Sequence, residues 1–81
     1  MISLYIKPTP ARPWQVVRVE GTNTTQMLMY DLSFEEWLEE QDQSQIAEIV
    51  ILNSELSPAE QEYAERVAER LSVNYDINIE V

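Results

Sequence analysis

Apolar and polar residues alternate at both ends of the chain. From Ile2 to Lys7 every second residue is a large aliphatic one, and from Val73 to Val81 five apolar residues alternate with four polar ones. This period of two predicts a strand with one buried face at each end. Between them, Ile46–Leu52 carries one charge and four β-branched side chains, a composition that predicts a central strand covered on both faces.

Two further β-branched or apolar runs, Trp14–Glu20 and Thr25–Asp31, are separated by Gly21–Thr24. This arrangement predicts a hairpin with a four-residue loop, in which the single glycine supplies a positive φ. In the first run, apolar residues occupy both faces of the expected strand. Either that strand is covered on both sides, or a bulge shifts its phase.

The connector Lys7–Pro13 contains three prolines. Proline donates no ladder hydrogen bond and favours extended backbone in its neighbours, so we expect a stiff, exposed segment. Pro10–Pro13 also matches the PxxP pattern of SH3 ligands. That pattern is short and common, and the connector is the favoured interpretation.

The spacing of apolar residues predicts a first helix within Leu32–Asp42. Ser33 is the expected N-cap, Glu36 completes a capping box at the third helical position, and Leu32 with Trp37 forms a hydrophobic staple. Glutamates four residues apart repel each other on the outer face of this helix.

A second helix is predicted after Ser57, which is followed by Pro58 at the first helical position and Glu60 at the third. Alanine, valine and leucine side chains fall on one arc of this helix, and an acidic stripe lies opposite. The predicted order of elements is βββαβαβ in one domain, residues 1–81. We therefore expect an α+β fold, with a mixed five-stranded sheet, both helices packed on one face, and a C-terminal β-α-β unit.

The net charge of −10 is distributed unevenly along the chain. Residues 1–30 carry three basic residues and one acid, whereas residues 31–81 carry fourteen acids and two arginines. A magnitude of about 2 to 8 suffices for the solubility of a small domain. The excess favours a partner with a basic surface and disfavours direct binding to nucleic acid or anionic lipid.

Few catalytic or cofactor chemistries are open to this composition. The chain has no histidine, no cysteine and one glycine, so it lacks the usual zinc ligands, a catalytic triad and a glycine-rich phosphate loop. We expect no enzyme activity, no cofactor and no metal site. The sequence also contains no membrane-spanning or signal segment, so we expect a cytoplasmic protein.

Two binding functions remain. In the first, carboxylates on the two helices imitate the phosphates of a nucleic acid and occupy a basic, nucleic-acid-binding site on a partner protein. In composition the chain is similar to small acidic inhibitors of phages and mobile elements, such as anti-CRISPR proteins and uracil-DNA glycosylase inhibitors. The candidate partner-binding residues are Glu35, Glu36, Glu39, Glu40, Asp42, Glu62, Glu65 and Glu69.

In the second, the protein is a small adaptor or regulatory subunit, and its acids serve solubility. It would bind a partner through an exposed sheet face or through a sheet edge. The C-terminal strand is the expected edge, where a homodimer can also form.

Overall fold

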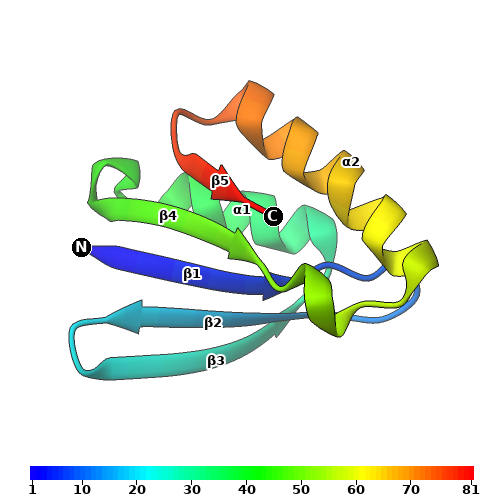
Figure 1. The fold of residues 1–81 in the computed structure, drawn as a ribbon. Coiled ribbons are helices and arrows are strands. Elements are labelled where there is room, and N and C mark those ends of the chain that lie inside the picture. The colour runs from blue at the N-terminus through cyan, green and yellow to red at the C-terminus, as the bar shows by residue number, and fades with distance from the viewer.

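The computed structural model describes residues 1–81 and contains a mixed five-stranded sheet and two α-helices (Figure 1). The strands are β1 (Ile2–Lys7), β2 (Trp14–Glu20), β3 (Asn23–Met29), β4 (Ile46–Ile51) and β5 (Asn78–Glu80). The helices are α1 (Asp31–Glu40) and α2 (Pro58–Asn74), and two short 3₁₀ turns are η1 (Gln43–Gln45) and η2 (Asn53–Glu55). The predicted α+β class and the order βββαβαβ are confirmed.

The strands are arranged in the order β3-β2-β1-β4-β5. β1 pairs antiparallel with β2 and parallel with β4, and β4 pairs parallel with β5. The predicted C-terminal β-α-β unit is therefore present as β4-α2-β5. β4 lies inside the sheet between β1 and β5, as expected of a central strand, but β1 occupies the middle position, and β4 is covered by helices on one face only, so the prediction that both of its faces are covered is wrong.

Both helices pack on the same face of the sheet. Seventeen buried residues form one cluster, which combines inward side chains of the strands with Phe34 and Leu38 of α1 and with Ala64, Val67, Ala68 and Leu71 of α2. These helical positions are three or four residues apart, as one buried stripe requires. The opposite face of the sheet has no helix over it (Figure 1).

The hairpin is tighter than the sequence suggests. Glu20 pairs with Asn23, so the loop has two residues, and the predicted four-residue loop is wrong. Gly21 has the predicted positive φ, +60°, and no other residue has a positive φ, which matches a type II′ turn. The register of β2 is continuous, so this strand contains no bulge. Val17 and Val19 lie half-buried on the uncovered face.

Helix α1 starts three residues earlier than predicted. Its N-cap is Tyr30, which makes no side-chain cap, and the Phe34 amide already donates to the Tyr30 carbonyl at 2.9 Å. Ser33 therefore lies inside the first turn, and the predicted capping box with Glu36 is wrong. The chain enters the helix directly from β3, and Asp31 in the first turn complements the helix dipole.

Helix α2 begins with the predicted capping box. The Glu60 amide donates to Ser57 Oγ at 3.3 Å, and the Ser57 amide donates to Glu60 Oε1 at 2.9 Å. The hydrogen bond from the Ser57 backbone is the main cause that lowers the pKa of Glu60. Because this pKa is lowered in the folded state, its contribution to stability is present at neutral pH and is lost as pH falls through the folded pKa.

The two serines provide a matched test of these helix starts. We expect Ser57→Ala to lower the free energy of unfolding by about 1 kcal/mol, because a cap is lost. Ser33→Ala should change it by a few tenths of a kcal/mol at most, because Ser33 occupies a helical position where alanine is favourable. Urea denaturation followed by circular dichroism measures both; equal losses would contradict the placement of Ser33.

The C-terminal strand is shorter than predicted. Helix α2 continues through Asn74, and strand pairing starts only at Asn78, which lies opposite Glu48 of β4. Tyr75 and Ile77 are buried in the core without belonging to a strand, whereas Val73 is 79% exposed. The alternating pattern thus spans a helix end, a loop and a strand, because tertiary packing places Tyr75 and Ile77 in the core.

The proline connector is partly buried, which the prediction of an exposed segment missed. Pro8 and Thr9 are buried, and the Trp14 indole N–H donates to the Thr9 carbonyl at 3.1 Å. The Thr9 hydroxyl donates to the Arg12 carbonyl at 3.0 Å, across a bend. Pro10–Pro13 is therefore bent instead of extended, unlike the polyproline II form in which SH3 domains bind their ligands.

Candidate functional site

Acidic residues on α1 divide between two sides of the helix. Asp31 and Glu35 face α2, where Arg70 lies between the helices, with its Nη2 3.6 Å from Asp31 Oδ2 and its Nε 3.3 Å from Glu35 Oε2. Both of these arginine nitrogens are buried and make no hydrogen bond of good geometry. Their contacts are therefore ion pairs, and Glu35 serves the packing of the two helices.

Glu39 also contacts the second half of the chain. The Tyr75 hydroxyl donates to Glu39 Oε1 at 3.2 Å. Desolvation of the phenol, together with this hydrogen bond and the negative charge of Glu39, raises the pKa of Tyr75 to about 12. Glu39 thus helps hold the end of α2 against α1.

The raised pKa of Tyr75 has a consequence for stability at alkaline pH. The folded state holds the phenolic proton more tightly than the unfolded state, whose pKa is about 10. We therefore expect stability to fall as pH rises from about 10 to 12, and Tyr75→Phe should flatten this dependence. Denaturation midpoints between pH 8 and roughly 12 measure the difference; identical slopes for both proteins would contradict it.

The acids of α2 lie on the side of that helix away from α1. Glu65 and Glu69 are exposed and, at 100° per residue, point well away from Arg70, which faces α1. Glu62 pairs with Arg66 at 3.7 Å on the exposed surface. The two acidic stripes do not adjoin, because Arg66 and Arg70 lie between them.

The eight predicted site residues therefore fall into two groups. Four have contacts within the chain: Glu35 with Arg70, Glu39 with Tyr75, Glu62 with Arg66, and Asp42 with Ser44, which it caps at the start of η1. The other four are exposed and have no salt bridge or hydrogen bond: Glu36, Glu40, Glu65 and Glu69.

All five basic residues of the protein are within reach of an acid. Besides Arg66 and Arg70, Lys7 lies 3.8 Å from Glu55, Arg12 lies 3.1 Å from Glu60, and Arg18 lies 2.9 Å from Glu20. The rest of the negative charge has no cation from the chain to balance it. No group of three or more acidic side chains is arranged to hold a metal ion, and neither helix has the length and apolar character needed to cross a membrane.

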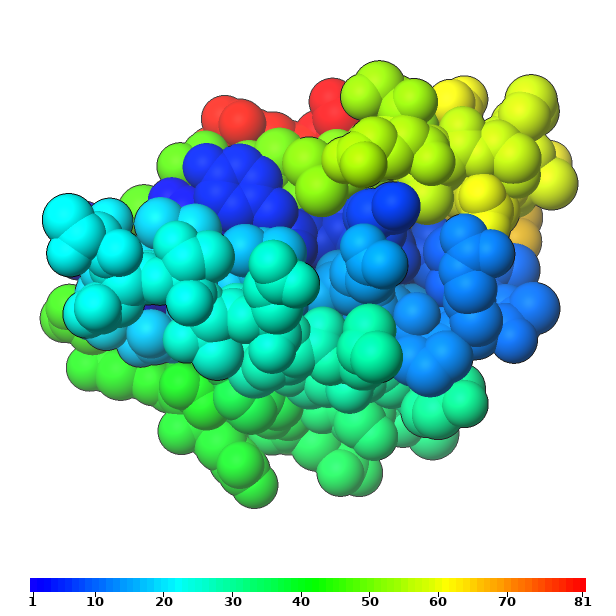
Figure 2. Space-filling model, turned by 90° about the horizontal axis from the view of Figure 1, so that it is seen from below, coloured from blue at the N-terminus to red at the C-terminus, as the bar shows by residue number.

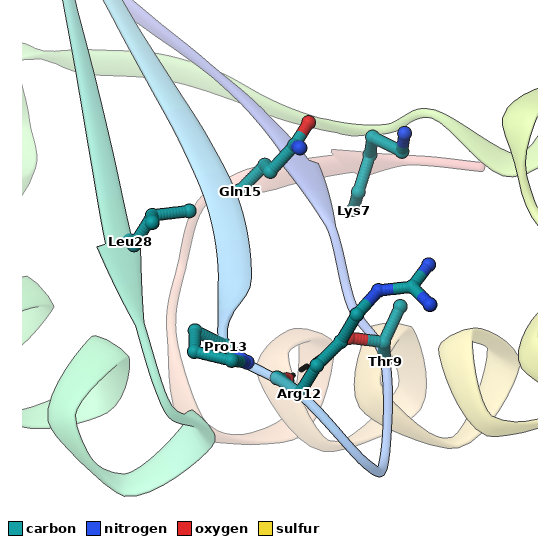
Figure 3. Close-up of a pocket in the computed structure, with 6 residues that line it drawn as sticks. All are labelled: Lys7, Thr9, Arg12, Pro13, Gln15 and Leu28. Atoms are coloured by element: carbon teal, nitrogen blue, oxygen red, sulfur yellow. Dashed lines mark hydrogen bonds between the residues drawn. The ribbon is translucent and has the colours of Figure 1, made fainter.

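A pocket of about 200 Å³ lies beside the proline connector, and one of its six lining residues is hydrophobic (Figure 3). Lys7, Gln15 and Leu28 reach it from three neighbouring strands, and Thr9, Arg12 and Pro13 close it from the connector. Its two cations are those paired with Glu55 and Glu60.

The most accessible edge of the sheet is β3, not the C-terminal strand. β3 has seven residues, none charged, and most of them are exposed. Figure 2 shows it along the front of the molecule, with α1 along its lower side and nothing over it. β5, at the other edge, has three residues and offers fewer free backbone groups.

Large apolar side chains are exposed where β3 leads into α1. Leu28 is 69% exposed, Tyr30 64% and Leu32 70%. The sequence pattern did not predict this exposed region, because Leu28 and Tyr30 fit an ordinary hairpin strand and Leu32 fits a helix staple. The available signal was the lack of any charge in Asn23–Met29, since natural edge strands usually carry a charge, a proline or a bulge.

No protein-family model matches this chain, and no curated protein or solved structure is significantly similar to it.

Proposed function

We propose that this protein is a small protein-binding regulator, which engages a basic partner protein through the β3 side of its sheet. The proposal joins the adaptor mode of binding with a role for the acidic surface. The single observation that carries it is the long, uncharged and uncovered edge strand β3.

An edge strand presents unpaired backbone N–H and C=O groups, which bind any extended chain that approaches. The charges, prolines and bulges with which proteins guard such edges are all missing from β3. An unguarded edge is an aggregation hazard unless a partner uses it. Its retention beside Leu28, Tyr30 and Leu32, three exposed apolar side chains, supports an interaction surface at this end of the molecule.

The negative charge supports the choice of a basic partner. A net charge of −10 on 81 residues accelerates encounter with a positively charged protein and discourages contact with acidic ones. In this proposal the acidic residues attract a basic partner protein and disfavour acidic ones, while β3 and the exposed apolar side chains near it stabilise the complex.

A capture experiment with matched variants tests the proposal. Tagged protein is used to capture partners from a cell lysate at low and high salt, and the captured proteins are identified by mass spectrometry. We expect Leu28→Ser with Leu32→Ser to lose the specific partner. Val73→Ser, at a residue 79% exposed on α2, should keep it. Equal capture by both variants would refute a binding surface at β3.

Nucleic-acid mimicry is a second candidate, and the four exposed, unpaired glutamates Glu36, Glu40, Glu65 and Glu69 favour it. Against it stands their separation by Arg66 and Arg70, since a phosphate mimic needs a continuous row of negative charge. Replacing these four glutamates with glutamine should abolish binding of a mimic, and salt should weaken its complex steeply. Binding that survives both changes but fails in the Leu28 and Leu32 variant excludes mimicry.

A further inference from the structure

We propose that the partner docks by adding a β-strand to β3, and that this strand alternates basic residues with apolar ones. This inference rests on the proposed function and specifies the chemistry of the ligand at the same surface. It follows from three features: the free backbone groups of β3, the position of Glu36 and Glu40, and the apolar surface on the opposite face.

The register of the hairpin shows which residues of β3 have free backbone N–H and C=O groups. In a hairpin with a two-residue loop, the two residues that flank the loop, here Glu20 and Asn23, exchange backbone hydrogen bonds. Along the two strands, hydrogen-bonded pairs then alternate with pairs that are not hydrogen-bonded. Thr24, Gln26 and Leu28 therefore point their N–H and C=O groups away from β2, toward solvent. An added strand can bond to all three residues without disturbing the existing ladder.

Two carboxylates of α1 lie on the side of that helix away from α2. α1 starts two residues after β3 ends and lies on the covered face of the sheet, behind β4 in Figure 1 and along the lower side of β3 in Figure 2. Since Asp31 and Glu35 face α2, the helical repeat turns Glu36 and Glu40 away from α2, toward the β3 side. Trp37 lies on the same side and is half-buried against the core.

The spacing of these carboxylates matches an added strand. Residues four apart on a helix are about 6 Å apart along its axis, and alternate residues of a strand are about 6.8 Å apart on one face. Two basic side chains separated by one residue therefore have the same spacing as Glu36 and Glu40. Neither glutamate has a cation partner within the chain.

The intervening residues of the added strand face the uncovered side of the sheet. There they meet Leu28, which is 69% exposed, and a shallow groove of about 320 Å³ lined by residues 15–17 and 26–28, in which Val17 and Leu28 are the apolar side chains on the uncovered face. An apolar residue at every second position fits this surface. The ligand is therefore a strand with the pattern basic–apolar–basic.

Charge argues against a second copy of this chain as the occupant. Two molecules joined through β3 would place their helices, and with them Glu36 and Glu40, on the same face of one continuous sheet. Each molecule carries a net charge of −10, and like charges brought together across an interface oppose its formation.

The test uses a capped eight-residue peptide of alternating lysine and valine as the probe, with binding measured by calorimetry and by NMR of the labelled protein. A peptide of four lysines followed by four valines has the same charge and composition and is the control. We expect the alternating peptide to bind more tightly and to shift the amide signals of Thr24, Gln26 and Leu28. Equal binding of the two peptides would overturn the proposal.

Backbone pairing is tested by N-methylation of the peptide. Methyl groups on the valine nitrogens block an antiparallel addition, and methyl groups on the lysine nitrogens block a parallel one. If either set of methyl groups abolishes peptide binding, strand addition is supported, and the set that does so shows whether the added strand is antiparallel or parallel. If the peptide still binds with both sets, strand addition is overturned.

The same pairing is tested from the side of the protein. Gln26→Pro removes an outward N–H and should abolish peptide binding, while Gln26→Thr should keep peptide binding.

The charge contacts are tested with two matched double variants. Glu36→Gln with Glu40→Gln should weaken peptide binding about three- to ten-fold, as expected for two exposed ion pairs. Glu65→Gln with Glu69→Gln changes the net charge equally and should have a smaller effect. Equal effects would show non-specific attraction and overturn the assigned contacts.

These outcomes are separable from those of the proposed function. If Leu28→Ser with Leu32→Ser abolishes capture of a partner while that partner still binds Gln26→Pro, β3 is a binding surface and strand addition is wrong. If neither variant affects capture, both proposals fail.

Discussion

Replacing Trp14 with alanine is expected to lower the free energy of unfolding by about 3–5 kcal/mol, the usual cost of removing a large buried aromatic side chain. Trp14 is 1% exposed, and its ring lies 5.5 Å from Phe34 and 6.2 Å from Tyr63. It therefore joins β2 to both helices. Its indole N–H also binds the Thr9 carbonyl, so the substitution releases the proline connector as well.

This loss is large relative to the whole stability of the protein. At roughly 0.05–0.15 kcal/mol per residue, a chain of this length has about 4–12 kcal/mol in total. Trp14→Ala should thus remove a large share of the stability and shift the denaturation midpoint to a clearly lower urea concentration. Urea denaturation followed by circular dichroism measures this, with Trp37→Ala, at a half-buried tryptophan of α1, as the control. A loss at Trp14 no larger than that at Trp37 would contradict its central position.

Reversing the charge at Arg70 is expected to have the second largest effect. Arg70→Glu would place a third carboxylate between Asp31 and Glu35, both of which now contact the guanidinium. We expect a loss of about 2–4 kcal/mol, below the full cost of a disrupted buried pair because the arginine side chain is 39% exposed. Arg70→Met, which keeps most of the apolar stem, should cost about half as much.

The control for this prediction lies one turn earlier in the same helix. Arg66 pairs with Glu62 on the open surface, where a salt bridge contributes a few tenths of a kcal/mol. Arg66→Glu should therefore be tolerated. High salt should reduce the deficit of Arg70→Glu, because screening weakens the repulsion among the three carboxylates. A similar loss at the two arginines would show that Arg70 does not hold the helices together.

Local patterns predicted most elements of this fold. The capping box at Ser57, the positive φ of Gly21 and the buried arc of α2 were all predicted from the sequence, because each depends on residues within a turn or two. The same reasoning placed Ser33 wrongly as a cap. A serine followed three residues later by a glutamate resembles a helix start wherever it occurs, and the backbone of Tyr30 and Asp31 had already entered the helix.

The candidate site was only partly predictable. Helical periodicity identified the exposed glutamates, but it did not show that Glu35 and Glu39 face α2 and are used by Arg70 and Tyr75. Nor did it show that β3 is the long free edge. Both facts depend on which elements become neighbours.

The sequence by itself determined the kinds of element, their order and the excess of negative charge, because these depend on composition and short-range periodicity. Only the tertiary structure decided that β1 lies in the middle, that β3 lies at an edge, and that Arg66 and Arg70 separate the acids of the two helices. Strand pairing and helix orientation are set by contacts between residues far apart in the chain. The free energy of those contacts is shared by the whole core, and no single segment of the sequence encodes it.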